Sequence, residues 1–219
     1  MYTITIFAVG FCYTLYTTMR RYIVYCFLFC FISLKLSAQN LSVVVNYTTT
    51  PKLSDAKDLI FYDGKRKLNW SDFRASPDDN SIAAALTDAG FGYSSSYSYS
   101  EGKGILTITV YCDFTKDGSW VKTADKNDYI LRHEQHHFDI SYICTMQFID
   151  KLRKMVLTTS DFNKLIGEAY KETAMAMSAM QNQYDTETQH GLIKDKQQEW
   201  SDKIDQQLEA LQPPNAADQ

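Results

Sequence analysis

The chain has 219 residues, of which 45% are hydrophobic and 22% charged, and its formal net charge at pH 7 is −4. Residues 1–38 hold three basic and no acidic side chains, so residues 39–219 hold 19 basic and 26 acidic ones, a formal charge of −7. This acidic balance excludes nucleic acid as an expected partner. The 181 residues from position 39 onward are enough for a sizeable core, and we predict a single domain over residues 39–212.

Residues 1–38 have the pattern of a signal peptide rather than of a folded domain. Met19-Arg20-Arg21 is a basic start, residues 22–34 are apolar, and the small residue Ala38 precedes Gln39 at the expected cleavage point. We therefore expect Met19 to be the true initiator, and the mature protein to be secreted or periplasmic without stable insertion in a membrane. If residues 1–18 are translated, the alternative is an apolar anchor, although no uninterrupted run reaches the length of a confident span.

Sequence patterns in residues 39–124 predict β structure. The clearest strand is residues 105–112, where apolar side chains alternate mainly with threonine, the period of a half-buried strand. Asp63-Gly64 separates two short β-type runs and predicts a hairpin turn. We expect a mostly antiparallel sheet made from residues 41–47, 59–62, 67–70, 83–99 and 105–112.

Residues 125–212 read as helical, so the expected fold class is α+β. A first helix is expected over residues 128–154, with Asp125 or Asn127 as its N-cap, and a second after Ser160, ending near Gly191. A third amphipathic helix surrounds Trp200. Residues 213–219 are expected to be a flexible tail.

The first of these helices contains His133-Glu134-Gln135-His136-His137, which has the pattern His-Glu-x-x-His. Side chains four residues apart on a helix are neighbours, so His133 and His137 can bind one metal ion. Glu134 lies about 100° further round the helix, where it can act as the general base for a metal-bound water. Apolar residues on more than one side of this helix indicate burial, which favours a metal over a solvated polar face. We predict one zinc ion per chain.

Catalytic zinc commonly takes three protein ligands, so a third ligand is needed. The helical phase of His136 carries it away from the ion, which leaves His190 as the other candidate imidazole. We rank His190 first and Glu187 second, since Glu187 falls within the apolar stripe of its helix while Asp185 points away from that stripe. Tyr184 is a candidate oxyanion donor, with a buried structural role as the alternative. Asp139 is a candidate for orienting a ligand histidine, with a surface role as the alternative.

Only two cysteines, Cys112 and Cys144, follow the leader. In an oxidising compartment an even pair suggests one disulfide, which would fix the helix of residues 128–154 against the sheet. Two buried free thiols are the equally ranked alternative, because sequence spacing alone does not bring two Cα atoms within bridging distance.

Four segments together resemble an uncharacterised bacterial family described as predicted secreted zinc-dependent proteases, over nearly all of the mature chain. His136 stands where a smaller residue such as glycine is expected. The resemblance implies a zincin-like arrangement and favours His190 as the third ligand. The segments are His133-Glu134-Gln135-x-His137-Phe138-Asp139-Ile140, Trp70-x-Asp72-Phe73, Ser119-Trp120-Val121, and Tyr184-Asp185-x-Glu187-Thr188-x-His190-Gly191 with Trp200.

The expected function is therefore a zinc metallopeptidase that hydrolyses peptide bonds in a peptide or protein substrate. Glu134 would take a proton from the zinc-bound water and pass it to the leaving amine. One alternative is a non-enzymatic envelope protein in which the metal pins helices together, and another is a peptide-binding pseudo-protease. The sequence indicates neither the cleavage specificity nor the oligomeric state.

Overall fold

A computed structural model describes residues 39–54 and 56–211, so the expectations for residues 1–38 and 213–219 lie outside the described part of the chain. The elements below all belong to one compact unit, Asn40–Gln219. Its secondary structure is α+β, with strands in the first half and three long helices in the second, as predicted. None of the helices in the described residues combines the length and apolar character needed to cross a bilayer.

Strand β5 (Lys103–Thr115) is the centre of the main sheet. One of its edges pairs along nearly its whole length with β4 (Ala89–Ser100), antiparallel. The other edge pairs first with β1 (Ser42–Tyr47), parallel, and then with β2 (Leu59–Phe61), antiparallel. The sheet is therefore mixed but mostly antiparallel, as expected, and β1 is its parallel strand.

The alternation in β5 has the predicted effect. Its alternate side chains Leu106, Ile108, Val110 and Cys112 are completely buried beneath the helices. Glu101 and Gly102 make the tight turn between β4 and β5, both with positive φ, a backbone conformation that glycine adopts without strain.

A second, two-stranded sheet pairs β3 (Ala85–Leu86) with β6 (Trp120–Val121). Three short 3-10 helices complete the first half: η1 (Ala56–Asp58), η2 (Trp70–Asp72) and η3 (Thr123–Asp125). Helix η2 carries a capping box between Asn69 and Asp72, and Trp70 packs against Phe73 at one end of the core.

The predicted hairpin over residues 59–70 is wrong. Asp63 does make a turn, in which its side chain accepts hydrogen bonds from the backbone N–H groups of Lys65 and Arg66. The strand before the turn pairs with β5 instead of with residues 67–70. The N–H of Leu68 donates to the side chain of Gln135 on a helix, so the second half of the supposed hairpin is held by a contact distant in sequence.

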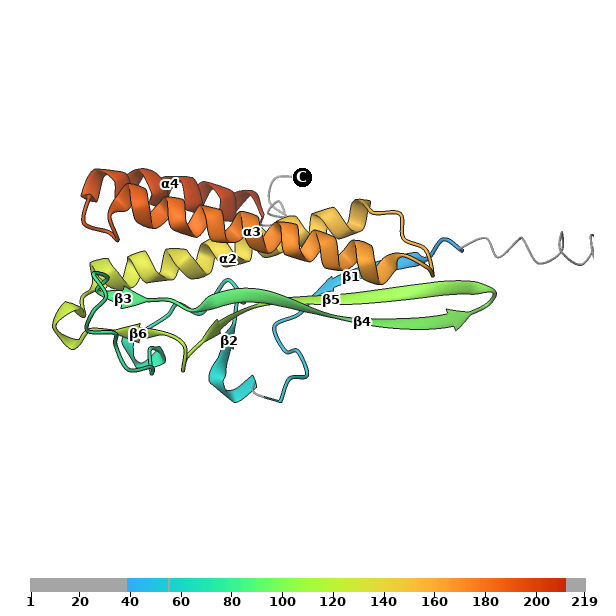
Figure 1. Cartoon of the computed structure of the whole chain (residues 1–219), viewed down its shortest axis with the longest axis horizontal. Helices are drawn as coiled ribbons and strands as arrows, with labels where there is room; N and C mark the ends of the chain where they lie inside the picture. The colour runs from blue at the N-terminus through green and yellow to red at the C-terminus, as the bar shows by residue number, and fades with distance from the viewer. Residues whose placement is uncertain (1–38, 55, 212–219) are drawn as a thin grey trace, which may run out of the picture. The chain divides into compact units, whose positions relative to one another are not determined.

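Helix α2 (Asp128–Lys154) lies between the sheet and the pair formed by α3 (Phe162–Thr188) and α4 (Lys194–Ala210), as Figure 1 shows. Its bounds are those predicted, and Asn127 caps it by accepting a hydrogen bond from the N–H of Ile130. Because α2 is covered on two sides, even its polar residues from His133 to His137 are buried. The predicted Ser160 cap of α3 is wrong, since Asp161 occupies the N-cap position and its carboxylate accepts from Thr158.

Cys112 and Cys144 are both buried free thiols, which is the second of the two alternatives for this pair. Cys112 packs on the sheet side of α2, in a cluster with Phe114 and Phe138. Cys144 packs on the opposite side, against Tyr184 and Trp200. The body of α2 therefore separates the two sulfurs.

Candidate metal centre

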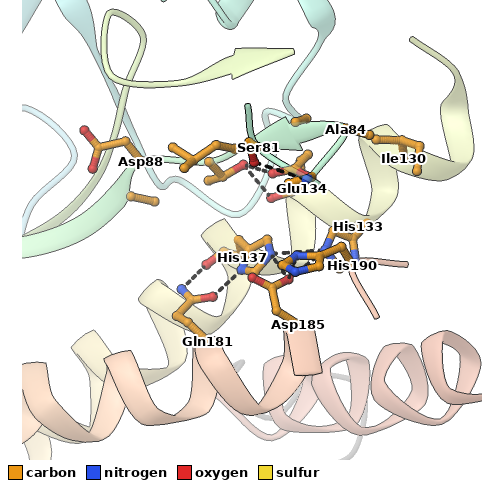
Figure 2. A pocket seen from close by; sticks show the side chains of 15 residues that line it. Ser81, Ala84, Asp88, Ile130, His133, Glu134, His137, Gln181, Asp185 and His190 are labelled. Carbon is orange, nitrogen blue, oxygen red and sulfur yellow. Dashed lines mark hydrogen bonds and ion pairs between the residues drawn. The ribbon is translucent and has the colours of Figure 1, made fainter. Parts of the chain in front are cut away.

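Helices α2 and α3 bring three potential ligands to one point. His133 and His137, one turn apart on α2, have their Nε2 atoms 3.2 Å apart. Oδ1 of Asp185 on α3 lies 3.1 Å from Nε2 of His133 and 3.0 Å from Nε2 of His137. Figure 2 shows the two imidazoles and the carboxylate facing one another.

These separations fit a metal ion. Two ligand atoms about 2.0–2.1 Å from a tetrahedral zinc are about 3.3–3.4 Å apart, close to the three distances between the donor atoms here. The side chains of His133, His137 and Asp185 are 3%, 11% and 29% exposed, so the group is mostly shielded but reachable. Two imidazoles and a carboxylate make a possible metal-binding triad, and this donor set suits zinc as well as iron.

Two glutamines fix the orientation of the imidazoles. Oε1 of Gln197 on α4 lies 2.8 Å from Nδ1 of His133, and Oε1 of Gln181 on α3 is hydrogen-bonded to Nδ1 of His137. An amide oxygen only accepts, so Nδ1 of each ring carries a proton and Nε2 is the nitrogen directed at the triad, where it can bind a metal once it has no proton of its own. The glutamine amides are held in turn, since Nε2 of Gln181 donates to the carbonyl of His137 and Nε2 of Gln197 to Tyr184.

The carboxylate and the imidazoles of the triad shift one another's pKa values toward the charged forms. Burial lowers the pKa of His137, but the hydrogen bond to Asp185 and the charges of Glu134 and Asp185 outweigh it and raise that pKa to about 9. Burial would raise the pKa of Asp185, yet the hydrogen bonds and charges of the two histidines hold it well below its usual value. In the absence of a metal, the site therefore holds a proton at neutral pH that a metal ion would displace.

The triad opens into a cavity of about 320 Å³ that also contains Glu134. This carboxylate is 3% exposed as a residue, and its Oε2 accepts a hydrogen bond from Oγ1 of Thr87 at 2.7 Å. Thr87 follows β3, so the small sheet and α2 hold the carboxylate from opposite sides. The triad and a buried carboxylate that could act as a base therefore line the same cavity.

Strand β3 forms one wall of this cavity. The N–H of Lys122 donates to the carbonyl of Ala84, so in this register Leu86 also directs its backbone groups toward β6. The backbone groups of Ala85 consequently point to the other edge of β3. In the described residues that edge pairs with no strand, and the small sheet ends there.

His190 lies beside the triad rather than in it. Its Nδ1 is 3.5 Å from Oδ1 of Asp185, and its side chain is 37% exposed on the cavity wall. Gln189, His190 and Gly191 all have positive φ, which turns the chain sharply after α3. The turn is anchored where Tyr129 donates to the carbonyl of Gly191, and a Cβ at Gly191 would lie 3.4 Å from the His133 ring.

The other candidates from the sequence lie elsewhere. Tyr184 is completely buried and stacks on the His133 ring, and its hydroxyl faces Gln197 rather than the cavity. Glu187, the second-ranked ligand, accepts a hydrogen bond from Trp200 outside the triad. His136 turns away from the triad, as its phase predicts, and burial lowers its pKa to about 3.

Asp139 is buried, but it accepts hydrogen bonds from Tyr62 and Gln135 and contacts neither ligand histidine, so both roles considered for it are wrong. The residues that sequence reasoning missed are Asp185, Gln181, Gln197 and Thr87. Gln181 and Asp185 are four residues apart on α3, the same spacing as the two histidines of α2, and this is the signal that could have identified them.

Comparison with known families gives one match. The family described as "Bacterial protein of unknown function (DUF922)" matches residues 65–191, more than half of the chain. The matched segment runs from the turn after β2 to Gly191 and therefore contains the whole triad, Glu134 and Thr87. A search of curated proteins and a search of solved structures each give no match.

Proposed function

The chain belongs to the DUF922 family, whose function is unknown, and from its site we propose that it is a secreted or periplasmic zinc-dependent peptidase. The observation that carries the proposal is one cavity that holds both the group His133, His137 and Asp185 and the buried carboxylate of Glu134. A purely structural ion has no need of a free carboxylate beside it, whereas hydrolysis needs a base next to the metal.

In this proposal His133, His137 and Asp185 hold the ion. His190 lies next to it, because its Nδ1 is 3.5 Å from Oδ1 of Asp185. A bound zinc ion would supply a Lewis acid that lowers the pKa of a water in the cavity to about 7. Glu134 would be the general base that takes a proton from this water and passes it to the leaving amine. Thr87 holds the carboxylate in place, and Gln181 and Gln197 keep both imidazoles in the tautomer that binds metal.

The unpaired edge of β3 supports a peptide as the substrate. An extended peptide can add to such an edge through its backbone, which would carry a peptide bond across the cavity. Residues 83–87 line the cavity beside Glu134, so the edge and the base are adjacent. Secretion rests on the signal-peptide pattern of residues 1–38.

The test begins with elemental analysis of the purified protein and of Asp185→Ala and His190→Ala variants. We expect near one zinc per wild-type chain, clear loss in Asp185→Ala, and a smaller effect in His190→Ala. Iron in place of zinc would refute the zinc assignment, and the absence of any metal after reconstitution would refute the proposal.

The second step separates an enzyme from its alternatives through Glu134→Gln. In a peptidase this variant keeps the metal and loses peptide cleavage by at least a hundredfold, the size of a general-base contribution. Metal binding without cleavage by the wild type would instead indicate the structural site that joins α2 to α3. Peptide affinity without turnover would indicate a peptide-binding protein.

A further inference from the structure

A second hollow of about 330 Å³ adjoins the metal centre. Two large apolar side chains border it, Ile82 from the loop before β3 and Leu192 from the turn between α3 and α4. They are 90% and 76% exposed, among the most exposed large apolar residues in the described chain. Single exposed apolar residues are ordinary, whereas these two come from distant segments and together give the hollow an apolar rim.

The hollow borders the cavity that contains the triad. Both are lined by the same four residues, of which Ala84 and Ile130 are apolar and Asp185 and His190 are polar. Figure 2 shows His190 beside the triad, with Ala84 and Ile130 across the cavity from Asp185. The hollow therefore lies within one side chain's length of the triad, because Asp185 belongs to both.

The charges in the lining of the hollow also bear on which side chains it can receive. Its remaining members are Thr186 and Gln189, so no lysine or arginine lines it, and its only acidic group is Asp185. An acidic side chain would find no lysine or arginine in this lining to pair with, and it would lose its hydration against Ile82 and Leu192. A small side chain would leave Ile82 and Leu192 in water.

We propose that this hollow is the specificity pocket of the site and receives a bulky apolar side chain, such as leucine or phenylalanine, next to the peptide bond that is cleaved. This inference rests on the proposed peptidase function, and it adds the class of residue that the substrate carries. Burying such a side chain against Ile82, Ile130 and Leu192 favours it over alanine by at least tenfold, the discrimination that apolar pockets achieve for differences of one or more methylene groups.

The experiment uses the zinc-loaded protein and a series of dipeptide hydroxamates that differ only in one side chain: alanine, leucine, phenylalanine or aspartate. Calorimetric Kd values give the selectivity without relying on turnover. The test variant is Ile82→Ser with Leu192→Ser, whose positions are exposed and outside the triad. The matched control is Val156→Ser with Met175→Ser, which removes two side chains that are 74% and 65% exposed and lie away from the site.

We expect the leucine or phenylalanine hydroxamate to bind at least tenfold more tightly than the alanine one, and the aspartate one to bind most weakly. The double test variant should lose this preference while keeping one zinc per chain, and the control should retain it. Equal affinities for all side chains on zinc-loaded protein would overturn the specificity pocket and leave the proposed peptidase function intact. Failure to bind zinc at all would overturn both.

Discussion

Replacement of Gln197 by leucine tests whether the α4 helix tunes the metal centre. Gln197 is buried, and its Oε1 accepts from Nδ1 of His133 at 2.8 Å while its Nε2 donates to Tyr184 at 2.6 Å. Loss of a partner that orients a ligand histidine typically weakens metal binding by 10- to 100-fold, or about 1.4–2.7 kcal/mol. Each buried group left unpaired also costs about 1–3 kcal/mol of folding stability, so we expect a lower melting temperature as well.

The zinc Kd is measured by competition with a chromophoric chelator, at a temperature where circular dichroism shows each variant to be folded. Tyr184→Phe is the matched control, because it removes the hydroxyl to which Nε2 of Gln197 donates and keeps the ring that stacks on His133. It should lower stability but not zinc affinity. Gln197→Glu should restore affinity, since a carboxylate accepts from Nδ1 of His133 at least as well as an amide oxygen. A Gln197→Leu protein that binds zinc within threefold of wild type would refute the reasoning.

Three further outcomes follow from titrating and buried groups. Zinc must displace a proton from His137, because the pKa of this residue is raised to about 9. The affinity for zinc should therefore rise by up to about tenfold per pH unit between pH 7 and 9 and then level off. A competition titration that gives the same zinc affinity at every pH would contradict this. Burial and the charge of Asp88 raise the pKa of Asp113 from 3.8 to about 6. The folded state therefore loses stability as pH rises from about 4 through 6, by about 3 kcal/mol before solvent screening is considered. Asp113→Asn should therefore raise stability by about 1–2 kcal/mol at pH 8 and by nothing at pH 3.5, as measured by urea unfolding. The buried thiols of Cys112 and Cys144 should react with a thiol reagent only after denaturation, and a protein with no reactive thiols in concentrated guanidinium would show them to be bridged.

The parts of the fold that were predictable depend on local sequence. The start of α2 follows from the Asn127 cap, and its length follows from an apolar pattern that includes Ile130 and Leu131 and continues from Phe138 to Leu152. The inward face of β5 follows from the strict alternation of its residues. The relation between His133 and His137 is equally local, because one helical turn fixes it whatever the surrounding structure does.

The parts that were not predictable depend on contacts between distant segments. Residues 59–61 have the same β character whether they pair with residues 67–70 or with β5, and only the tertiary structure favours β5. The same is true of β1, whose parallel pairing reflects the route of the chain around the sheet rather than any property of residues 42–47. Turn signals identify where a chain bends but not which strand it then meets.

Asp185, the third member of the possible metal-binding triad, illustrates how contacts between distant segments decide which side chains face a site. Counted at 100° per residue from Phe162, Asp185 lies about 140° away from the start of the apolar stripe, which suggested a solvent-facing position. The early part of α3 buries Ile166 and Ala169 against the sheet-side core, whereas its end buries Tyr184 between α2 and α4. The buried face therefore changes partner along the helix, and near the cavity it includes Asp185 and Gln181. A phase measured from one end of a 27-residue helix does not describe the other end when the neighbours of the helix differ. For that reason the average direction of the apolar stripe is a poor guide to the third member of the triad. A better guide is that Gln181 and Asp185 are four residues apart, like the two histidines on the adjacent helix.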